Sequence, residues 1–223
     1  MSSLQLSLFG AEAAPADPTD LEGLLAGPGQ VVRLGGTARV SVVVAEQWRA
    51  RALLTEFADR GLAGSQVATA DSHIGVRTVF SAALASLAAR WTHGASTRPP
   101  DGFSLDGARL RLWFLAAGRT LGRPAPRGLL LGLSAESEAS WRPVRASLAQ
   151  LGLPAALVGV RAGGPAYRIV GRRRLARLGE LIGAAPPEAP AGTWPELGGV
   201  SFGGVMGSVR SSGSGPIGGN VGS

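Results

Sequence analysis

The chain contains one order of predicted secondary structure twice, and this repetition is the feature that most limits its fold. Residues 20–97 predict a helix, two strands, a helix, two strands and a closing helix. Residues 98–185 predict the same order, and the opening helices of the two repeats begin about 90 residues apart. Hydrophobic residues at helical or alternating spacing, separated by glycines, support each element. We therefore expect an α+β fold of two pseudo-symmetric αββαββα halves.

Local signals set the expected boundaries within the halves. Asp20 is a plausible N-cap for the first helix, which we expect over Leu21–Ala26. Two glycines at 35 and 36 separate two β-rich segments and predict a hairpin. Pro143 falls inside a predicted helix of the second half, where it either kinks the helix or marks its true start.

The two ends of the chain differ in composition from the halves. Residues 1–19 contain prolines and small residues, which predict a flexible arm. Residues 186–223 are dominated by glycine and serine and predict a disordered tail that contributes nothing to a core. No apolar stretch reaches the length of a membrane helix, and the N-terminus lacks the features of a secretory signal. We expect a cytoplasmic protein with no membrane partner.

Positive charge is concentrated in one part of the chain. The net charge is +7, and all of the basic residues are arginine. Residues 1–97 carry seven arginines against eight acids, whereas residues 98–185 carry fourteen against five. A field of this kind attracts polyanions, most often nucleic acid, although a merely solubilising surface has the same composition.

Several kinds of chemistry are excluded by composition. Cysteine is absent, which removes disulfides, thiolate metal sites and cysteine nucleophiles. Lysine is absent as well, which removes Schiff-base chemistry and a Walker-type phosphate site. The two histidines, His73 and His93, have no evident companions for a metal site or a hydrolytic triad. We predict no metal, no cofactor and no catalytic residue.

The opening helices of the two halves carry a recognisable pattern. The first reads LEGLLAGPG over residues 21–29, and the second reads LRLWFLAAG over residues 110–118. In their sequence, spacing and following αββαββα order, these segments resemble the LAGLIDADG motif. The chain over residues 20–185 is thus similar to the LAGLIDADG homing endonucleases, and in particular to the degenerate N-terminal domain of WhiA-type regulators.

The resemblance implies an architecture and a loss of catalysis. The two motif helices would pack together on a pseudo-twofold axis, and the antiparallel sheets would form a saddle that lies in the major groove of DNA. The acidic motif positions that bind the catalytic metal in this family fall on Pro28 and Ala117, which cannot ligate a metal. Leu112 stands where the motif has a small residue, which predicts looser helix packing. We therefore expect a protein that is not an enzyme.

Arginines supply the candidate DNA contacts. Arg33 and Arg39 fall on the first predicted hairpin. Further arginines fall on the equivalent strands of the second half and in its densest basic cluster, which is centred on residues 172–174. The phosphate backbone would offset the unfavourable position of that cluster at the start of a helix. The complete candidate set is Arg33, Arg39, Arg119, Arg123, Arg127, Arg168, Arg172, Arg173, Arg174 and Arg177.

A second motif lies in the N-terminal arm. Gln5, Leu6, Ser7, Leu8 and Phe9 match the pentapeptide with which bacterial proteins bind the replication sliding clamp. Leu8 and Phe9 supply large apolar anchors for a hydrophobic pocket, while Gln5 supplies amide hydrogen bonds. A chance apolar cluster, or a contact that holds the arm to the domain, is the alternative interpretation.

Together these features predict a monomeric, non-catalytic protein that binds duplex DNA and docks on the sliding clamp, with an accessory role in replication or repair at the nucleoid. The alternative is a WhiA-like transcriptional regulator that does not bind the clamp. Two further alternatives remain open. One is a nuclease that uses displaced acids such as Glu22, Asp71 or Glu136, and the other is an interaction scaffold that binds no DNA.

Overall fold

The computed structural model describes residues 11, 14–69, 71–94, 96–122, 126–134 and 138–195. The first half contains η1 (Pro18–Leu21), α1 (Glu22–Ala26), β1 (Gln30–Leu34), β2 (Thr37–Val44), α2 (Gln47–Asp59), β3 (Gly64–Ala68), β4 (Ile74–Thr78), η2 (Ala82–Leu84) and α3 (Ala85–Trp91). A short hairpin of β5 (Thr92–His93) and β6 (Ser96–Thr97) precedes the second half. That half contains α4 (Gly107–Ala117), β7 (Gly118–Leu121), β8 (Gly128–Gly132), α5 (Glu138–Gln150), β9 (Ala156–Val158), η3 (Val160–Ala162), β10 (Ala166–Val170) and α6 (Arg172–Ile182).

The two halves form equivalent four-stranded antiparallel sheets. The strand order is β1-β2-β4-β3 in the first and β7-β8-β10-β9 in the second. In the first sheet, Leu34 pairs with Thr37 across a two-residue turn, in which Gly35 has a φ of +57°. This conformation suits glycine and matches the turn expected from the sequence. The predicted αββαββα order of both halves is confirmed, and Pro143 lies inside α5.

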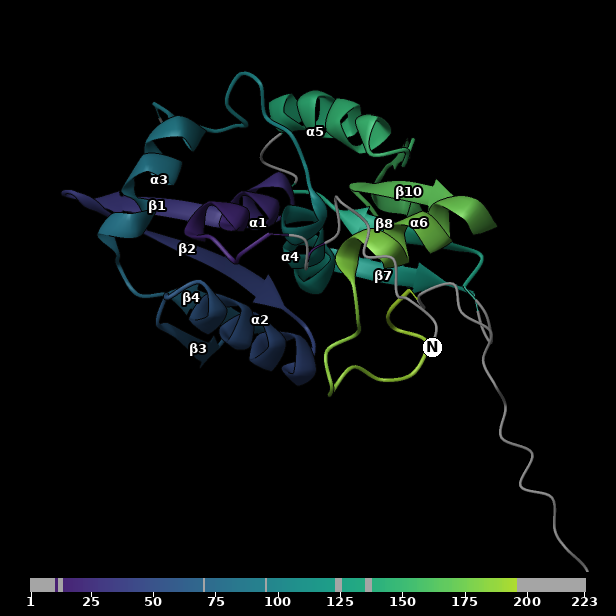
Figure 1. Cartoon of the computed structure of the whole chain (residues 1–223), viewed down its shortest axis with the longest axis horizontal. Helices are drawn as coiled ribbons and strands as arrows, with labels where there is room; N and C mark the ends of the chain where they lie inside the picture. The colour runs from purple at the N-terminus through teal and green to yellow at the C-terminus, as the bar shows by residue number, and fades with distance from the viewer. Residues whose placement is uncertain are drawn as a thin grey trace, which may run out of the picture.

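The helices cover one face of each sheet. In Figure 1, α2 lies in front of strands of the first sheet and α6 in front of strands of the second. The core lies between the helices and sheets and is continuous across the two halves, from Val40 and Phe57 in the first to Leu131 and Tyr167 in the second. One hydrophobic core therefore holds both halves together.

Helices α1 and α4 pack side by side at the centre of the molecule (Figure 1). Their backbones approach so closely that a Cβ built on Gly23 would lie 1.9 Å from the carbonyl oxygen of Arg109. A Cβ on Gly27 would lie 2.4 Å from the Trp113 ring. Leu112 is fully buried beside this contact. The prediction of looser packing from Leu112 is therefore wrong, because the small residues of α1 alone allow the close approach.

A buried ionic cluster surrounds the start of the two central helices. Asp20 binds Arg60 at 3.1 Å, and Arg60 also binds Glu56 at 2.8 Å. Glu56 in turn binds Arg111 of α4 at 2.5 Å, which links the halves. The prediction that Asp20 caps the first helix is therefore wrong. The N-cap of η1 is Asp17, whose carboxylate accepts a hydrogen bond from the Thr19 amide. Burial of Asp20 among the ion pairs raises the pKa of its carboxyl group.

The start of the expected tail is folded. Residues 184–195, which we call the strap, return across α4, and Trp194 is buried there. The Trp194 ring meets Phe114 edge to face at 5.0 Å, and its Nε1–H donates to the Gly183 carbonyl. The prediction that residues 186–223 contribute nothing to the core is therefore wrong for the described part. A single large aromatic side chain supplies enough apolar area to fix a segment of small residues.

The described part of the arm is also attached to the fold. The Ala11 amide donates to the carbonyl of Leu181 in α6 at 2.7 Å, and Asp17 and Thr19 form the cap of η1. Residues 1–19 are thus not uniformly a flexible arm. Among the described residues, no helix is both long and apolar enough to span a bilayer.

Candidate nucleic-acid interface

Each sheet has an open face opposite its helix-covered face. On β2, Val40 and Val42 point into the core, so the alternate residues Arg39, Ser41 and Val43 lie on the open face. Strand register extends this assignment across the first sheet, because directly paired residues share a face. The open face of the first sheet comprises Gln30, Val32, Leu34, Thr37, Arg39, Ser41, Val43, Ser65, Val67, Gly75 and Arg77.

Equivalent rows of paired residues cross the two open faces. In the first sheet the row is Gln30, Ser41, Arg77 and Ser65. In the second sheet the matching strands give Arg119, Leu130, Arg168 and Ala156. Gln30 and Arg119 each lie one residue beyond the final glycine of their motif helix. Arg77 and Arg168 are therefore pseudo-symmetric, and both side chains are exposed.

Arg33 and Arg39 do not share a face. Arg33 pairs with the buried Ala38, whereas Arg39 pairs with Val32 on the open face. The two arginines, both expected to face the groove, therefore lie on opposite faces of the sheet, since side chains alternate along each strand and directly paired residues share a face. The Arg39 guanidinium lies 4.8 Å from the centre of the Phe80 ring. Within the described residues, its buried Nε has no hydrogen-bond partner.

The open face of the second sheet is partly covered by its own chain. Arg119 Nη2 donates to the carbonyl of Gly163 at 2.5 Å, in the connection between β9 and β10. Beneath this connection Leu130 is only 4% exposed. Arg168 lies across from Leu130 in the register and remains exposed. On the open face of the second sheet, Arg119 and Arg168 therefore flank Leu130, whose side chain is buried.

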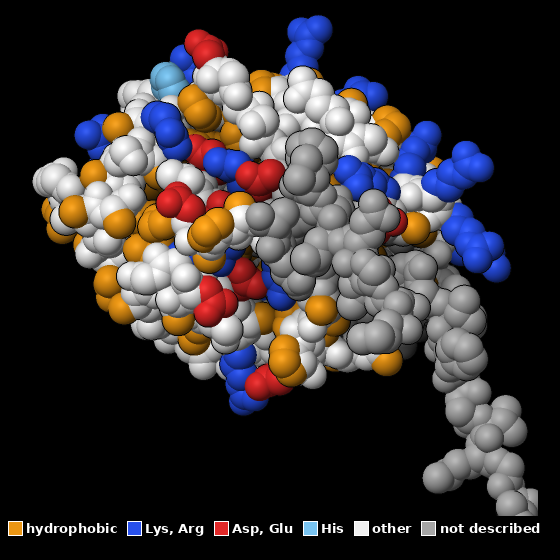
Figure 2. All heavy atoms as spheres, in the orientation of Figure 1, with side chains coloured by type: hydrophobic (Ala, Val, Ile, Leu, Met, Phe, Trp, Pro, Cys, Tyr) orange, Lys and Arg blue, Asp and Glu red, His pale blue; other side chains and the backbone are white. Residues whose placement is uncertain are grey.

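Further arginines gather at one end of the second sheet. Val170 pairs with Gly128, which places Arg127 and the start of α6 at the same end. Arg127, Arg172, Arg173 and Arg174 are all exposed there. Figure 2 shows basic side chains collected along the edge where Figure 1 places β10 and α6. Arg177 lies further along α6 beside Glu180, at 3.5 Å, and Arg123 lies outside the described residues.

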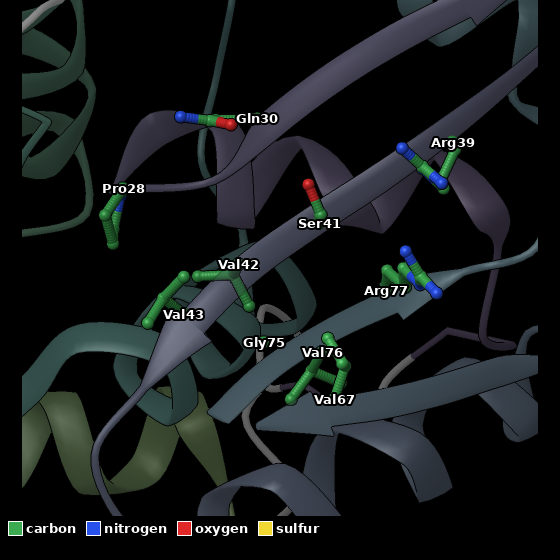
Figure 3. A pocket seen from close by; sticks show the side chains of 10 residues that line it. All are labelled: Pro28, Gln30, Arg39, Ser41, Val42, Val43, Val67, Gly75, Val76 and Arg77. Atoms are coloured by element: carbon green, nitrogen blue, oxygen red, sulfur yellow. The ribbon is translucent and has the colours of Figure 1, made fainter. Parts of the chain in front are cut away.

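A hollow of about 270 Å³ lies on the open face of the first sheet. Pro28, Gln30 and side chains of β2, β3 and β4 line it (Figure 3). Arg39 and Arg77 lie at one end of this hollow, and Val43 and Val67 lie at the other (Figure 3). The hollow therefore combines cationic donors with an apolar end.

The C-terminal ends of α1 and α4 carry no acidic side chain. Pro28 follows α1 and Ala117 ends α4, and neither side chain has an atom that can ligate a metal. Instead, Arg49 of α2 binds the end of α4. Its Nη1 donates to the carbonyls of Phe114 and Leu115, and its Nη2 donates to the carbonyl of Gly118 at 2.6 Å.

Arg49 is a buried cation that joins the halves. Only 6% of its side chain is exposed, and burial lowers the pKa of its guanidinium. Glu46, at 2.8 Å, acts in the opposite direction by favouring the charged form. The positive charge lies at the end of α4 where the carbonyl dipoles point, so it complements the helix macrodipole.

The acids proposed as displaced catalytic groups lie elsewhere. Glu22 is buried at the start of α1, and its two carboxylate oxygens bind Arg90 at 2.6 Å and Arg109 at 3.1 Å. Asp71 lies in the exposed turn between β3 and β4, and Glu136 lies outside the described residues. In the part of the chain that the structure describes, no three His, Asp or Glu side chains gather in a way that could hold a metal ion.

Two arginines that matter to this geometry were not among the predicted site residues. Arg77 follows a predicted turn, and its place opposite Ser41 depends on the pairing of β2 with β4, which local sequence does not reveal. Arg49 lies on an amphipathic helix, where an arginine is ordinarily solvated, and its carbonyl partners are 65 to 69 residues away in the sequence. The clamp motif, Gln5 to Phe9, lies outside the described residues.

Known proteins resemble this chain in three-dimensional structure and not in sequence. No protein-family model matches the chain, and no curated protein matches it in sequence. The homing endonuclease I-WcaI, solved bound to its DNA recognition sequence, is similar with a TM-score of 0.56 and 10% identity, over 76% of this chain and 81% of that one. The fold is therefore of the LAGLIDADG homing-endonuclease type, as the sequence predicts.

WhiA proteins also appear among the similar structures. The N-terminal LAGLIDADG domain of DUF199/WhiA has a TM-score of 0.49 and 18% identity, over 75% of this chain and 82% of that one. Full-length DUF199/WhiA from Thermatoga maritima has a TM-score of 0.49 and 14% identity, over 75% of this chain and 55% of that one.

Proposed function

We propose that this protein binds duplex DNA across the open faces of its two sheets and does not cleave it. The observation that carries the proposal is the pseudo-symmetric placement of Arg77 and Arg168 on these faces. A paired β-ribbon fits the major groove, and exposed guanidinium groups suit phosphates and base edges. The basic end of the second sheet, around Arg127 and Arg172, extends the same positive field.

The absence of cleavage rests on the residues at the junction of the two central helices. The resemblance to the LAGLIDADG endonucleases implies that phosphodiester hydrolysis needs carboxylates there to hold a divalent cation. Pro28 and Ala117 supply hydrocarbon instead, and Arg49 puts a positive charge at the end of α4. Supercoiled plasmid incubated with the protein and magnesium or manganese is expected to stay intact. Nicking above that of a mock purification would contradict this part of the proposal.

The proposed cellular role is accessory to DNA replication or repair at the nucleoid, through the sliding clamp. Its support is the pentapeptide at residues 5–9, which combines a glutamine with large apolar anchors. Binding to DNA and binding to the clamp would then be performed by separate parts of one chain.

The DNA interface is tested by removing two charges from the open faces. The Arg77→Gln/Arg168→Gln variant is expected to bind a 30-base-pair duplex about 10-fold more weakly than the wild type. The slope of log affinity against log salt concentration should fall by about 1–2, since each lost phosphate contact removes about one unit. Fluorescence anisotropy at several salt concentrations measures both quantities.

The matched control is Arg33→Gln/Arg142→Gln. It removes the same charge from exposed arginines that lie off the open faces, on the helix-covered side of β1 and on α5. This variant is expected to retain affinity within about 2-fold. Equal weakening by both variants would show that only the overall charge matters and would contradict the assigned interface.

Clamp docking is tested with the Leu8→Ala/Phe9→Ala variant. The wild-type chain is expected to bind a bacterial sliding clamp with micromolar affinity, and the variant is expected to lose at least 10-fold because both anchors are gone. Isothermal titration calorimetry measures the affinities. Leu4→Ala, which truncates a leucine just outside the pentapeptide, is the control and should bind like the wild type. A wild-type chain that does not bind the clamp would reduce the pentapeptide to coincidence.

A further inference from the structure

The open face of the first sheet is far more apolar than a phosphate-binding surface needs to be. Leu34 is 63% exposed and Val43 is 54% exposed, and the exposed fractions of Val67 and Val32 are 47% and 44%. These side chains share the open face with Arg39 and Arg77. Exposed apolar side chains set among cations indicate a ligand that presents both negative charge and hydrocarbon.

One row of this face forms a pocket for a small apolar group. Val43 of β2 pairs with Gly75 of β4, and Gly75 pairs with Val67 of β3. Gly75 has no side chain, so the row is two valines with a gap between them. Val67 leans over this gap, because a Cβ on Gly75 would lie only 3.2 Å from its Cγ1, so an apolar group would rest against Val67 above Gly75. All three residues line the hollow of Figure 3.

The polar end of the hollow adjoins this gap directly. Arg77 is two residues from Gly75 on the same strand, so their Cα atoms are about 7 Å apart. The Arg77 Nε is 3.4 Å from the Ser65 hydroxyl, a weak interaction that leaves the end of the guanidinium exposed. A ligand with its hydrocarbon between the valines would thus meet a guanidinium about two base-pair rises away.

In duplex DNA, the major groove presents hydrocarbon in one form, the methyl group on C5 of a pyrimidine. We propose that Val43, Gly75 and Val67 form a site for a pyrimidine C5-methyl group, supplied by thymine or by 5-methylcytosine. Arg77 and Arg39 then hold the adjoining base edge or phosphate. This inference rests on the proposed DNA binding and adds a sequence preference, centred on the first half.

The asymmetry between the halves supports this assignment. The equivalent positions in the second sheet are Gly132, Ala166 and Val158, where two of the three side chains are small or absent. That face instead carries Arg119 and Arg168 on the two strands that flank Leu130. The second half therefore contributes guanidinium groups without an apolar gap beside them, whereas the first half adds the contact to a pyrimidine methyl group.

The test compares duplexes that differ only in methyl groups. One 30-base-pair duplex of mixed sequence is prepared with thymine and again with deoxyuridine at every thymine position, which leaves charge and hydrogen-bonding groups unchanged. The wild-type chain is expected to bind the thymine duplex about 4-fold more tightly for each methyl group it buries. A third duplex adds 5-methylcytosine to the deoxyuridine duplex, and recovered affinity would show that either source of methyl is accepted.

Variants assign the preference to the hollow. Val43→Thr/Val67→Thr keeps the shape of both side chains and suits a strand, so the variant is expected to fold, as circular dichroism checks. It should lose part of the preference for thymine over deoxyuridine, because a hydroxyl replaces one of the two methyl groups at each position while the other can still contact a pyrimidine methyl. Val32→Thr makes the same change on the same open face but outside the hollow, and it should retain the preference.

Three outcomes would overturn the proposal, and they are distinguishable. Equal binding of thymine and deoxyuridine duplexes by the wild-type chain would refute the methyl site while leaving DNA binding intact. Failure to bind any duplex would refute the proposed function itself. A wild-type dimer in analytical ultracentrifugation that Val43→Thr/Val67→Thr dissociates would show that a second copy of the chain covers this face instead.

Discussion

Replacing Gly23 by alanine is expected to destabilise the protein by about 3 kcal/mol or more, although it adds a single methyl group. In an isolated helix this change stabilises by roughly 1 kcal/mol, because alanine is the better helix former. Here the new Cβ would lie 1.9 Å from the Arg109 carbonyl oxygen and 2.7 Å from its Cα. These are backbone atoms that no side-chain rotation can move, so α1 and α4 must separate.

Separation of these helices would open the core shared by both halves, which explains the size of the expected effect. Urea denaturation followed by tryptophan fluorescence measures the free energy of unfolding, since Trp113 and Trp91 are fully buried. Gly36→Ala is the matched control, because nothing lies within 4 Å of its built Cβ and its φ is not positive. We expect that control to change stability by less than about 0.5 kcal/mol. Similar stability of both variants would show that the helices do not pack as closely as described.

Replacing Arg49 by methionine is expected to cost about 2–4 kcal/mol. Methionine fills much of the same space, so the loss comes from the polar contacts rather than from a cavity. The carbonyls of Phe114, Leu115 and Gly118 would lose their guanidinium donors in a site that water does not reach freely. Each buried acceptor left without a partner costs about 1–3 kcal/mol, and the Phe114 carbonyl keeps a second donor, the Gly118 amide.

The same helix provides a control for the Arg49 prediction. Arg51 is two residues away, 60% exposed, and its partner Glu188 is itself 51% exposed. Arg51→Met is expected to cost less than about 1 kcal/mol, because exposed ion pairs contribute little. The two variants are compared by thermal and urea unfolding. An Arg49→Met protein as stable as Arg51→Met would mean that the guanidinium does not bridge the halves.

Periodicity and turn residues were enough to predict the order of elements, whereas side-chain roles at element ends were not predictable from local sequence. Asp20 stands before an apolar helix and therefore suggests a cap. Its actual partner, Arg60, is 40 residues away in the sequence and meets it only in the assembled fold. Trp194 lies among small residues, and its contact with Phe114 depends on the path of the whole strap.

The faces of the first hairpin could have been predicted in full. A two-residue turn at Gly35 and Gly36 makes Leu34 the partner of Thr37, so Arg33 must pair with Ala38 and Arg39 with Val32. The alternation of polar and apolar residues along most of β2 then identifies the buried face. By contrast, the pairing of Ser41 with Arg77 joins segments separated by a helix and another strand. Only the assembled sheet reveals it.

The last turn of α6 holds both ends of the described chain. The Ala11 amide donates to the carbonyl of Leu181, and the Trp194 Nε1–H donates to the carbonyl of Gly183, directly after that helix. Unwinding of this one turn would therefore release the first described residue and the strap together.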